Sequence, residues 1–333
     1  MADRNLILAG DIGGTKTHLA LFSVGGEKLE SQFKKIFSSK EYSGLEPVVE
    51  EFLTDHRASV RHACFGIAGP VIDGRVKTPN LPWIVDAAKI VRMFNLDSVD
   101  LLNDLEAAAY GVFTLEGDEL LCLHPGAPCR PANRALIAAG TGLGEAIIYD
   151  DGRNYHPLAS EGGHADFAPR DETEIDLLRF LIDRYGHVSY ERLLSGPGLL
   201  NIYDFLKEHA GYDEPNWLKN KLSRVNDPSA VISQEGLAGK SEICVKALDM
   251  FVSIYGAEAG NLALRAKALG GLYIGGGIAP KIRTKLRDGS FMRGFADKGR
   301  YKDFLAAVPV HVILNEQTPL RGAAYYAALR CHA

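Results

Sequence analysis

Short apolar runs alternate with polar stretches through the first 110 residues of the chain. Runs with a period of two, or short continuous runs, predict strands, whereas apolar residues three and four positions apart predict helices. On this basis we expect strands at 6–9, 17–23, 28–37, 63–68 and 99–102, and helices at 44–56, 87–94 and from 104 onward. This order of elements is typical of one α/β unit.

The second part of the chain repeats this pattern with a different sequence. Strands are expected at 135–138, 145–149 and 271–274, and helices at 173–184, 243–269 and 318–329, the last with Thr318 as N-cap and Pro319 in its first turn. Residues 125–131 are rich in proline and are expected to link two domains. Residues 213–236 are polar and are expected to form an irregular surface segment. The pattern therefore predicts two α/β units.

Composition then excludes several classes of function. The 333 residues include 37 Lys and Arg against 42 Asp and Glu, a net charge of −5, with 46% hydrophobic and 24% charged residues. This is typical of a soluble globular protein and gives no electrostatic reason to bind nucleic acid. No apolar run approaches the ~20 residues of a membrane span, and no signal peptide is recognisable at the start.

The five cysteines are scattered, and none forms a C-x-x-C pair. They are Cys64, Cys122, Cys129, Cys244 and Cys331. This usage predicts neither a zinc knuckle nor a redox motif, and it agrees with a reducing cytoplasm.

Residues 10–15 carry the clearest chemical signal. Two glycines between two strands predict a tight turn whose backbone N–H groups can approach a phosphate. Thr15 adds a hydroxyl donor, and Asp11 could hold Mg²⁺ through water. A plain glycine hairpin explains the two glycines equally well, but not the adjacent aspartate.

A second glycine turn follows the strand at 135–138. Residues 140–144 superficially resemble a dinucleotide-binding motif, but Glu145 stands where that motif needs its third glycine, and a strand follows instead of a helix. Residues 239–241 resemble the end of a P-loop, but Gln234 stands at the first glycine position, so we interpret Ser241 as a helix cap. A third cluster, residues 275–277, would suit the close approach of a flat nucleoside.

Polar residues follow several of the predicted strands. Asn103 and Asp104 stand where α/β folds bind ligands, and a carboxylate there can accept a proton from a substrate hydroxyl. The alternative is that Asp104 is only a helix N-cap. Glu161, His164 and Glu191 could hydrogen-bond a polyol, although a solvated glutamate on a helix face is the commoner case for Glu191.

Taken together, these motifs resemble bacterial glucokinases, within the sugar kinase, heat-shock chaperone and actin ATPase fold. The resemblance covers essentially the whole chain through GDIGGT (10–15), AGP (68–70), TPNLPW (78–83), LLNDLEAAAYG (101–111), AAGTGLG (138–144), EGGHADFAP (161–169), GHVSYERLLSGPGL (186–199) and GGGIAP (275–280). It implies an α/β, two-domain actin-like ATPase (ribonuclease H-like) fold, with a cleft between a small domain (1–115 plus 316–333) and a large domain (116–315). The implied activity is phosphorylation of glucose at its 6-hydroxyl by ATP, in the cytoplasm, usually by a homodimer.

The resemblance also implies roles for individual residues. Asp104 looks like the general base. The sugar-binding groups it implies are Asn80, Asn103, Asp104, Glu161, His164 and Glu191. The ATP-binding residues it implies are Gly10, Asp11, Ile12, Gly13, Gly14, Thr15, Gly140, Thr141, Gly142, Gly144, Gly276 and Gly277, with Mg²⁺ held by Asp11 through water.

Two departures separate the chain from the neighbouring repressor/open-reading-frame/kinase (ROK) family. That family carries a cysteine-rich zinc motif after its Gly-His dipeptide, whereas residues 165–167 here contain no cysteine, so no zinc is expected. Its repressors also carry an N-terminal DNA-reading helix pair, whereas the first strand here begins by Leu6. A sugar-responsive regulator without turnover remains the alternative from another class. The sequence leaves open which hexose and which phosphoryl donor are preferred.

Overall fold

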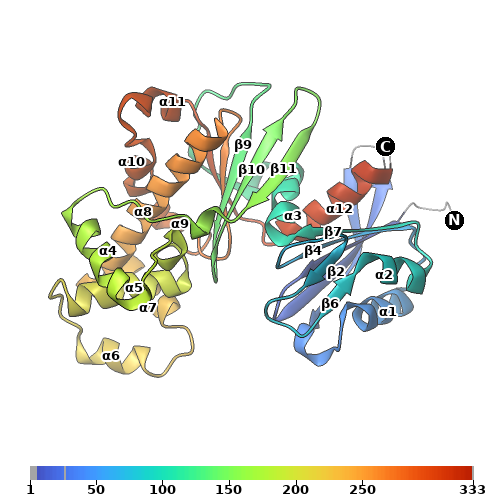
Figure 1. Ribbon diagram of the computed structural model, residues 1–333, viewed down its shortest axis with the longest axis horizontal. Helices are drawn as coiled ribbons and strands as arrows, with labels where there is room; N and C mark the ends of the chain where they lie inside the picture. Colours follow the sequence, from blue (N-terminus) through green and yellow to red (C-terminus); the bar gives the residue numbers. More distant parts are fainter. Residues whose placement is uncertain (1–5, 26–27, 332–333) are drawn as a thin grey trace. The chain divides into compact units, whose positions relative to one another are not determined.

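The computed structural model describes residues 6–25 and 28–331, and its contacts divide the chain into two units. The first comprises Met1–Gly117 and Asn315–Ala333, and the second comprises Asp118–Leu314. Each unit contains one large β-sheet with helices packed on it (Figure 1). None of the helices in the described ranges has the length and apolar character needed to cross a membrane.

The sheet of the first unit has the order β3-β2-β1-β4-β7. Its strands are β1 (Leu6–Ile12), β2 (Lys16–Gly25), β3 (Lys28–Ser38), β4 (His62–Ile67) and β7 (Ser98–Asn103). The first three are antiparallel, whereas β1, β4 and β7 run parallel, so the carboxyl ends of these three strands meet at one edge. The small β5 (Arg75–Lys77) and β6 (Ile84–Asp86) form a separate ribbon.

Alternation along β1 explains how helices cover both faces of this sheet. Ile7 and Ala9 pack on one face against α3 (Asp104–Gly111) and α12 (Thr318–Cys331), while Leu8 joins the core on the other face beneath α1 (Leu45–His56) and α2 (Ala87–Phe94). Gly322 of α12 lies directly against α3, because an added Cβ atom would lie 1.8 Å from the Ala107 carbonyl oxygen. The C-terminal helix thus holds the helix that begins at Asp104 (Figure 1).

The sheet of the second unit has the order β11-β10-β9-β12-β13-β8. Its strands are β8 (Leu120–His124), β9 (Arg134–Ala139), β10 (Leu143–Asp150), β11 (Tyr155–Ser160), β12 (Leu272–Gly275) and β13 (Val310–Ile313). Its helices are α4 (Glu172–Tyr185), α5 (Gly196–Glu208), α6 (Asn216–Leu222), α7 (Pro228–Leu237), α8 (Glu242–Ala266), α9 (Arg283–Leu286), α10 (Ser290–Ala296) and α11 (Lys302–Ala306). The 25-residue α8 forms the centre of this unit's core and packs against β9, β10 and α10.

Three sequence-based expectations were wrong. Residues 125–131 lie inside the second unit, between β8 and β9, so they do not link the units. Residues 213–236 contain α6 and most of α7, and α7 begins with a signal that was overlooked, an Asp227 cap followed by Pro228. Helix α8 ends at Ala266 rather than at residue 269, because Lys267 adopts a left-handed conformation with φ of 50°.

Candidate active site

Three parallel strands bring two carboxylates together in the first unit. Asp11 of β1 pairs with Gly66 of β4, and Ile67 pairs with Asn103 at the end of β7. Asp104 follows directly, and a Cβ atom added at Gly66 would lie 4.0 Å from the Asp104 Cα atom. The structure therefore places Asp11, Asn103 and Asp104 at one sheet edge, the carboxyl-terminal edge where α/β folds bind ligands.

This arrangement changes the pKa of Asp11. Burial, and secondly the negative charge of Asp104, raise the pKa of the Asp11 carboxyl from its ordinary 3.8 to about 6. Both causes disfavour the ionised form of Asp11. A cation bound near the two carboxylates would remove this penalty.

Asp104 is not the N-cap of α3, contrary to the alternative left open by the sequence. The cap is Asn103, whose Oδ1 accepts the Leu105 N–H at 3.0 Å, while the Glu106 carboxylate accepts the Asn103 backbone N–H. These two bonds form a capping box. The Asn103 side chain also donates to the Gly69 carbonyl at 3.2 Å. Asp104 Oδ1 also accepts the Leu105 N–H, at 2.9 Å, so this N–H has two acceptors and keeps the one from Asn103 when Asp104 is changed.

Replacing Asn103 with Ala should lower the free energy of unfolding by about 1–2 kcal/mol, since both the cap and the bond to Gly69 are lost. Urea denaturation measures this change. Asn95→Ala, outside the capping box, is not a suitable control because Asn95 has a left-handed backbone with φ of 53°. Asn154→Ala, on an exposed turn, is the better comparison. A loss no larger than that of the control would show that the cap contributes little.

The first glycine turn is held by a residue that the sequence did not indicate. Ser39 Oγ donates to the Gly13 carbonyl at 2.8 Å, and the Ser39 N–H donates to the Thr15 carbonyl at 3.0 Å. Asn80 packs on the same turn, because a Cβ atom at Gly14 would lie 2.7 Å from the Asn80 Cβ. Thr15 is exposed and can meet a ligand.

Two other residues of this turn have buried surroundings. Ile12 is 2% exposed, and its side chain belongs to the core, so only its backbone could contact a nucleotide. Gly10 lies between Phe65 and Leu19, where an added Cβ atom would be 2.5 Å and 2.9 Å from their side chains. Gly10 is therefore required for packing.

The second glycine turn is anchored by Glu191. The Leu143 N–H donates to Glu191 Oε2 at 3.0 Å, and a Cβ atom at Gly142 would lie 2.5 Å from the same oxygen. Glu191 is partly buried in the short helix Tyr190–Arg192, so the alternative of a solvated glutamate on a helix face does not apply. One of its oxygens holds the turn at residues 140–144, where Thr141 is exposed.

The third glycine cluster lies beside this second turn. Strands β9 and β12 run parallel with Ala138 paired to Gly275, so the segments that follow them are neighbours. Gly276 has a φ of 81°, and a Cβ atom there would lie 2.3 Å from the Ala139 carbonyl oxygen. Only glycine fits such a position. Gly277, by contrast, faces open space.

Glu161 and His164 form an exposed polar pair on the second unit. Glu161 precedes the short helix Gly162–His164 and His164 ends it, and His164 Nε2 lies 3.9 Å from Glu161 Oε2. Their side chains are 85% and 60% exposed, so their hydrogen-bonding groups are accessible to a ligand. The buried Phe167 anchors the segment that follows.

The carboxylates at this sheet edge fit a magnesium ion that is held mainly by the phosphates of a bound substrate. Within residues 6–25 and 28–331, no group of three or more His, Cys, Asp or Glu could hold a metal. Asp11 nevertheless supplies a carboxylate at the sheet edge, close enough to Asp104 for its charge to raise the Asp11 pKa. Mg²⁺ usually takes one or two carboxylates, retains water and binds substrate phosphates. The donor set is therefore suited to Mg²⁺ bound together with a nucleotide.

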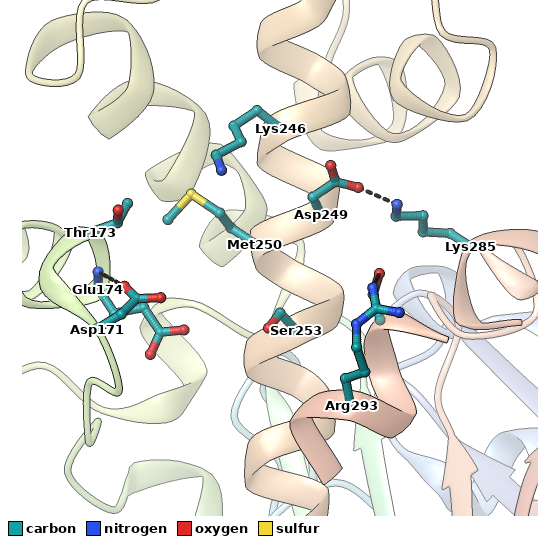
Figure 2. Close-up of a pocket in the computed structure, with 10 residues that line it drawn as sticks. Asp171, Thr173, Glu174, Lys246, Asp249, Met250, Ser253, Lys285 and Arg293 are labelled. Atoms are coloured by element: carbon teal, nitrogen blue, oxygen red, sulfur yellow. Dashed lines mark hydrogen bonds and ion pairs between the residues drawn. The ribbon is translucent and has the colours of Figure 1, made fainter. Parts of the chain in front are cut away.

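A polar cavity of about 330 Å³ lies elsewhere in the second unit, among α4, α8, α9 and α10 (Figure 2). Its charged groups largely offset one another, because Lys285 pairs with Asp249 and Asp288, and Glu174 pairs with Arg170. The residues lining it include none of the predicted site residues. Without an excess of positive charge it has little attraction for phosphate. We therefore place the candidate active site at the strand ends.

Comparison with known proteins agrees with this assignment. A family model described as glucokinase matches residues 8–330. The chain is 40% identical to the glucokinase of Nostoc sp. over 340 aligned positions, covering 97% of this chain and 99% of that protein. Among solved structures it is similar to the glucokinase of an Antarctic psychrotroph, with a TM-score of 0.88 and 30% identity, covering 98% and 99% of the two chains.

A more distant structure shares the fold alone. It is a ROK family glucokinase from Streptomyces griseus in complex with glucose and AMPPNP, with a TM-score of 0.63 and 21% identity, covering 97% and 99% of the two chains. The fold of this chain and the glycine turns at the ends of its strands define its class, which is that of the sugar kinases with the actin-like ATPase fold. Within that class, the chain belongs to the glucokinase family.

Proposed function

We propose that the protein transfers the γ-phosphoryl group of ATP to the 6-hydroxyl of glucose, with Asp104 as the general base. Phosphorylation of glucose by ATP is the activity of the family to which the chain belongs. The observation that carries the role of Asp104 is its position beside Asp11 at the carboxyl ends of parallel strands, on a helix capped by other residues.

In the proposed reaction, the glucose 6-oxygen forms a bond to the γ-phosphorus as the bond from that phosphorus to the ADP oxygen breaks. The hydroxyl proton passes to the Asp104 carboxylate. Most of the rate enhancement in such reactions comes from positioning and charge stabilisation. Mg²⁺, when bound with ATP, offsets part of the phosphate charge, and Asp11 would hold it through water.

The remaining predicted residues have complementary roles in this proposal. Asn103 has a second amide hydrogen besides the one donated to Gly69, and it can donate this to a sugar hydroxyl. Asn80, Glu161, His164 and Glu191 would bind the other hydroxyls. The glycine turns at 10–15 and 140–144 would bind the phosphates, with Gly276 and Gly277 near the adenine.

We further propose that the two units act as the small and large domains, 1–115 plus 316–333 and 116–315, and close on a cleft that contains both substrates. Closure would exclude water, which competes with the sugar as phosphoryl acceptor. The resemblance also supports a cytoplasmic homodimer, which light scattering of the purified protein would test.

A coupled assay of ADP release on adding glucose tests the proposed activity. Turnover supports a kinase, whereas glucose binding without ADP release would favour the sugar-responsive regulator. Mannose, fructose and glucosamine as acceptors, and polyphosphate or ADP as donors, ranked by kcat/KM, would define the substrate preference. A higher kcat/KM for another hexose than for glucose would contradict the proposed substrate.

Replacing Glu161 with Gln should raise the KM for glucose by about 10–100-fold while kcat changes little, because a charged hydrogen-bond acceptor contributes about 1.5–3 kcal/mol to binding. Steady-state kinetics with saturating ATP measure both constants. Glu172→Gln, an exposed glutamate at the start of α4, is the matched control. A fall in kcat with unchanged KM would show that Glu161 acts in the chemical step instead.

A further inference from the structure

Two glutamates are buried directly beneath the Glu161–His164 segment, and the mechanism above does not use either of them. Glu145 of β10 is 1% exposed and Glu258 of α8 is 0% exposed. Their carboxyl groups contact the same arginine and interact with each other. A hydrogen bond between the two groups would require a proton, because two carboxylates offer only acceptors.

One arginine serves both carboxyl groups. Arg265 Nη2 lies 2.8 Å from Glu258 Oε1, whereas Arg265 Nη1 lies 3.4 Å from Glu145 Oε2. Glu258 also accepts a hydrogen bond from Asn261 at 2.8 Å, but Glu145 Oε1 has no donor partner among the described atoms. Glu258 thus receives more hydrogen bonds than Glu145, so a proton shared by the pair is better held on Glu145.

The charged surroundings agree with this assignment. Arg265 is the cation that faces the pair, and Lys298 approaches from the segment after α10, with its pKa lowered by burial and by Arg170. The phenols of Tyr190 and Tyr255 face Glu258 and Glu145, and both have raised pKa values, mainly because of burial. Burial, and then the negative charge of Glu258, raise the pKa of Glu145 well above its usual range.

Glu145 is in contact with the proposed sugar-binding segment. A Cβ atom added at Gly162 would lie 2.2 Å from Glu145 Oε2, so the carboxyl group packs against the Gly162 backbone. Ser160 Oγ donates to the Glu145 carbonyl at 3.0 Å and ties the segment to the same residue. Glu145 also follows the glycine turn at 140–144 directly. A change in its charge would therefore act on the backbone between Glu161 and His164.

We propose that Glu145 and Glu258 share one proton and that this proton positions the Glu161–His164 segment for glucose. When the proton is lost, two adjacent buried carboxylates compete for Arg265, repel each other and displace the Gly162 backbone. Glu145 is in this sense a positioning residue, since it touches neither glucose nor ATP. The inference rests on the proposed role of Glu161 and His164 in binding glucose.

The test is the pH dependence of the KM for glucose from about pH 6.5 to pH 10, at saturating ATP. In the unsubstituted enzyme the KM should rise about threefold or more above neutral pH, with a smaller change in kcat. Glu145→Gln keeps the shape and supplies a permanent donor to Glu258, so its KM should stay nearly constant. Glu235→Gln, another buried glutamate that pairs with Lys221, is the control and should retain the rise.

Glu258→Gln provides a second variant if Glu145→Gln does not fold, because it removes the same repulsion from the other side. A flat KM profile in the unsubstituted enzyme, or a rise that both variants retain, would overturn the inference. An enzyme that fails to phosphorylate glucose at any pH would instead overturn the proposed function. In that case urea denaturation at several pH values still tests whether the shared proton exists. The free energy of unfolding of the unsubstituted protein should fall, relative to that of Glu145→Gln, as the pH rises. The reason is that the folded carboxyl group holds its proton more tightly than the unfolded one.

Discussion

Replacing Asp104 with Asn should lower kcat by about 10²–10⁴-fold while the KM for glucose changes little. The amide keeps the size of the side chain but cannot accept the hydroxyl proton. Helix α3 should remain intact, because the capping box of Asn103 and Glu106 is retained and an amide oxygen at position 104 can still accept the Leu105 N–H that Asp104 Oδ1 accepts. A loss of activity in this variant can therefore be separated from a loss of structure.

The coupled ADP assay measures the effect on kcat, and urea denaturation checks that the variant is folded. Glu106→Gln is the matched control, since it changes a carboxylate to an amide on the same helical turn, and it should retain most of its turnover. Near-normal kcat in Asp104→Asn would rule out Asp104 as the base. An equal loss in both variants would mean that the first turn of α3 is sensitive to any substitution.

Replacing Asp11 with Asn should abolish most of the activity and at the same time stabilise the substrate-free protein. A pKa raised from 3.8 to about 6 corresponds to at most about 3 kcal/mol of unfolding free energy lost at neutral pH. The amide carries no charge, so the variant escapes the burial of an ion and the repulsion from Asp104. We expect kcat/KM for ATP to fall by about 100-fold or more, because the proposed Mg²⁺ contact is lost.

The sign of the pH dependence makes this prediction specific. The folded Asp11 carboxyl binds its proton more tightly than the unfolded one, so ionisation costs nothing below about pH 4 and its full amount above about pH 6. The stability advantage of Asp11→Asn should accordingly appear between these pH values and stay constant above them. Urea denaturation at pH 4, 5, 6 and 7.5 would measure it. A variant less stable than the unsubstituted protein at pH 7.5 would contradict the electrostatic account of Asp11.

The two predictions concern adjacent carboxylates with different electrostatic surroundings. Asp11 is partly buried and ionises at a cost to the fold, which is the expected property of a group that works with a cation. Asp104 stands on the exposed first turn of a helix and raises the pKa of its neighbour. We infer that the fold tolerates the cost at Asp11 because the substrate-bound state uses its charge.

Local sequence patterns predicted much of the fold. The glycine hairpin after β1, the strand before Asn103, and the helices at 45–56 and 87–94 were all predicted within a few residues, because each depends on neighbouring residues and on hydrophobic periodicity. The strands β5, β6, β8, β11 and β13 were not predicted. Strands β5, β6 and β13 have three or four residues each, too few to show a period, and β13 is placed by pairing with β12 and β8, which lie far from it in the chain.

The same division applies to the candidate site. The residues that could carry out chemistry stand in recognisable local patterns, such as Asp11 before two glycines and Asn103-Asp104 after a strand. Asn103 followed three residues later by Glu106 is also a local capping-box pattern, which was overlooked. Ser39 and the Glu145–Glu258 pair gave no such signal. Ser39 lies 26 positions from the carbonyl that it holds, and Glu145 and Glu258 meet across two separate elements. Contacts of this kind do not produce a pattern that is local in the chain.

The sequence alone determined which backbone turns can receive phosphate and which side chains can exchange a proton, because those properties reside in residue types and their immediate neighbours. Only the tertiary structure decided that Asp11 ionises with difficulty, and that the buried Glu145 and Glu258 meet at one arginine beneath Gly162. Burial and the approach of a second charge set these properties, and both arise when segments far apart in the chain pack together.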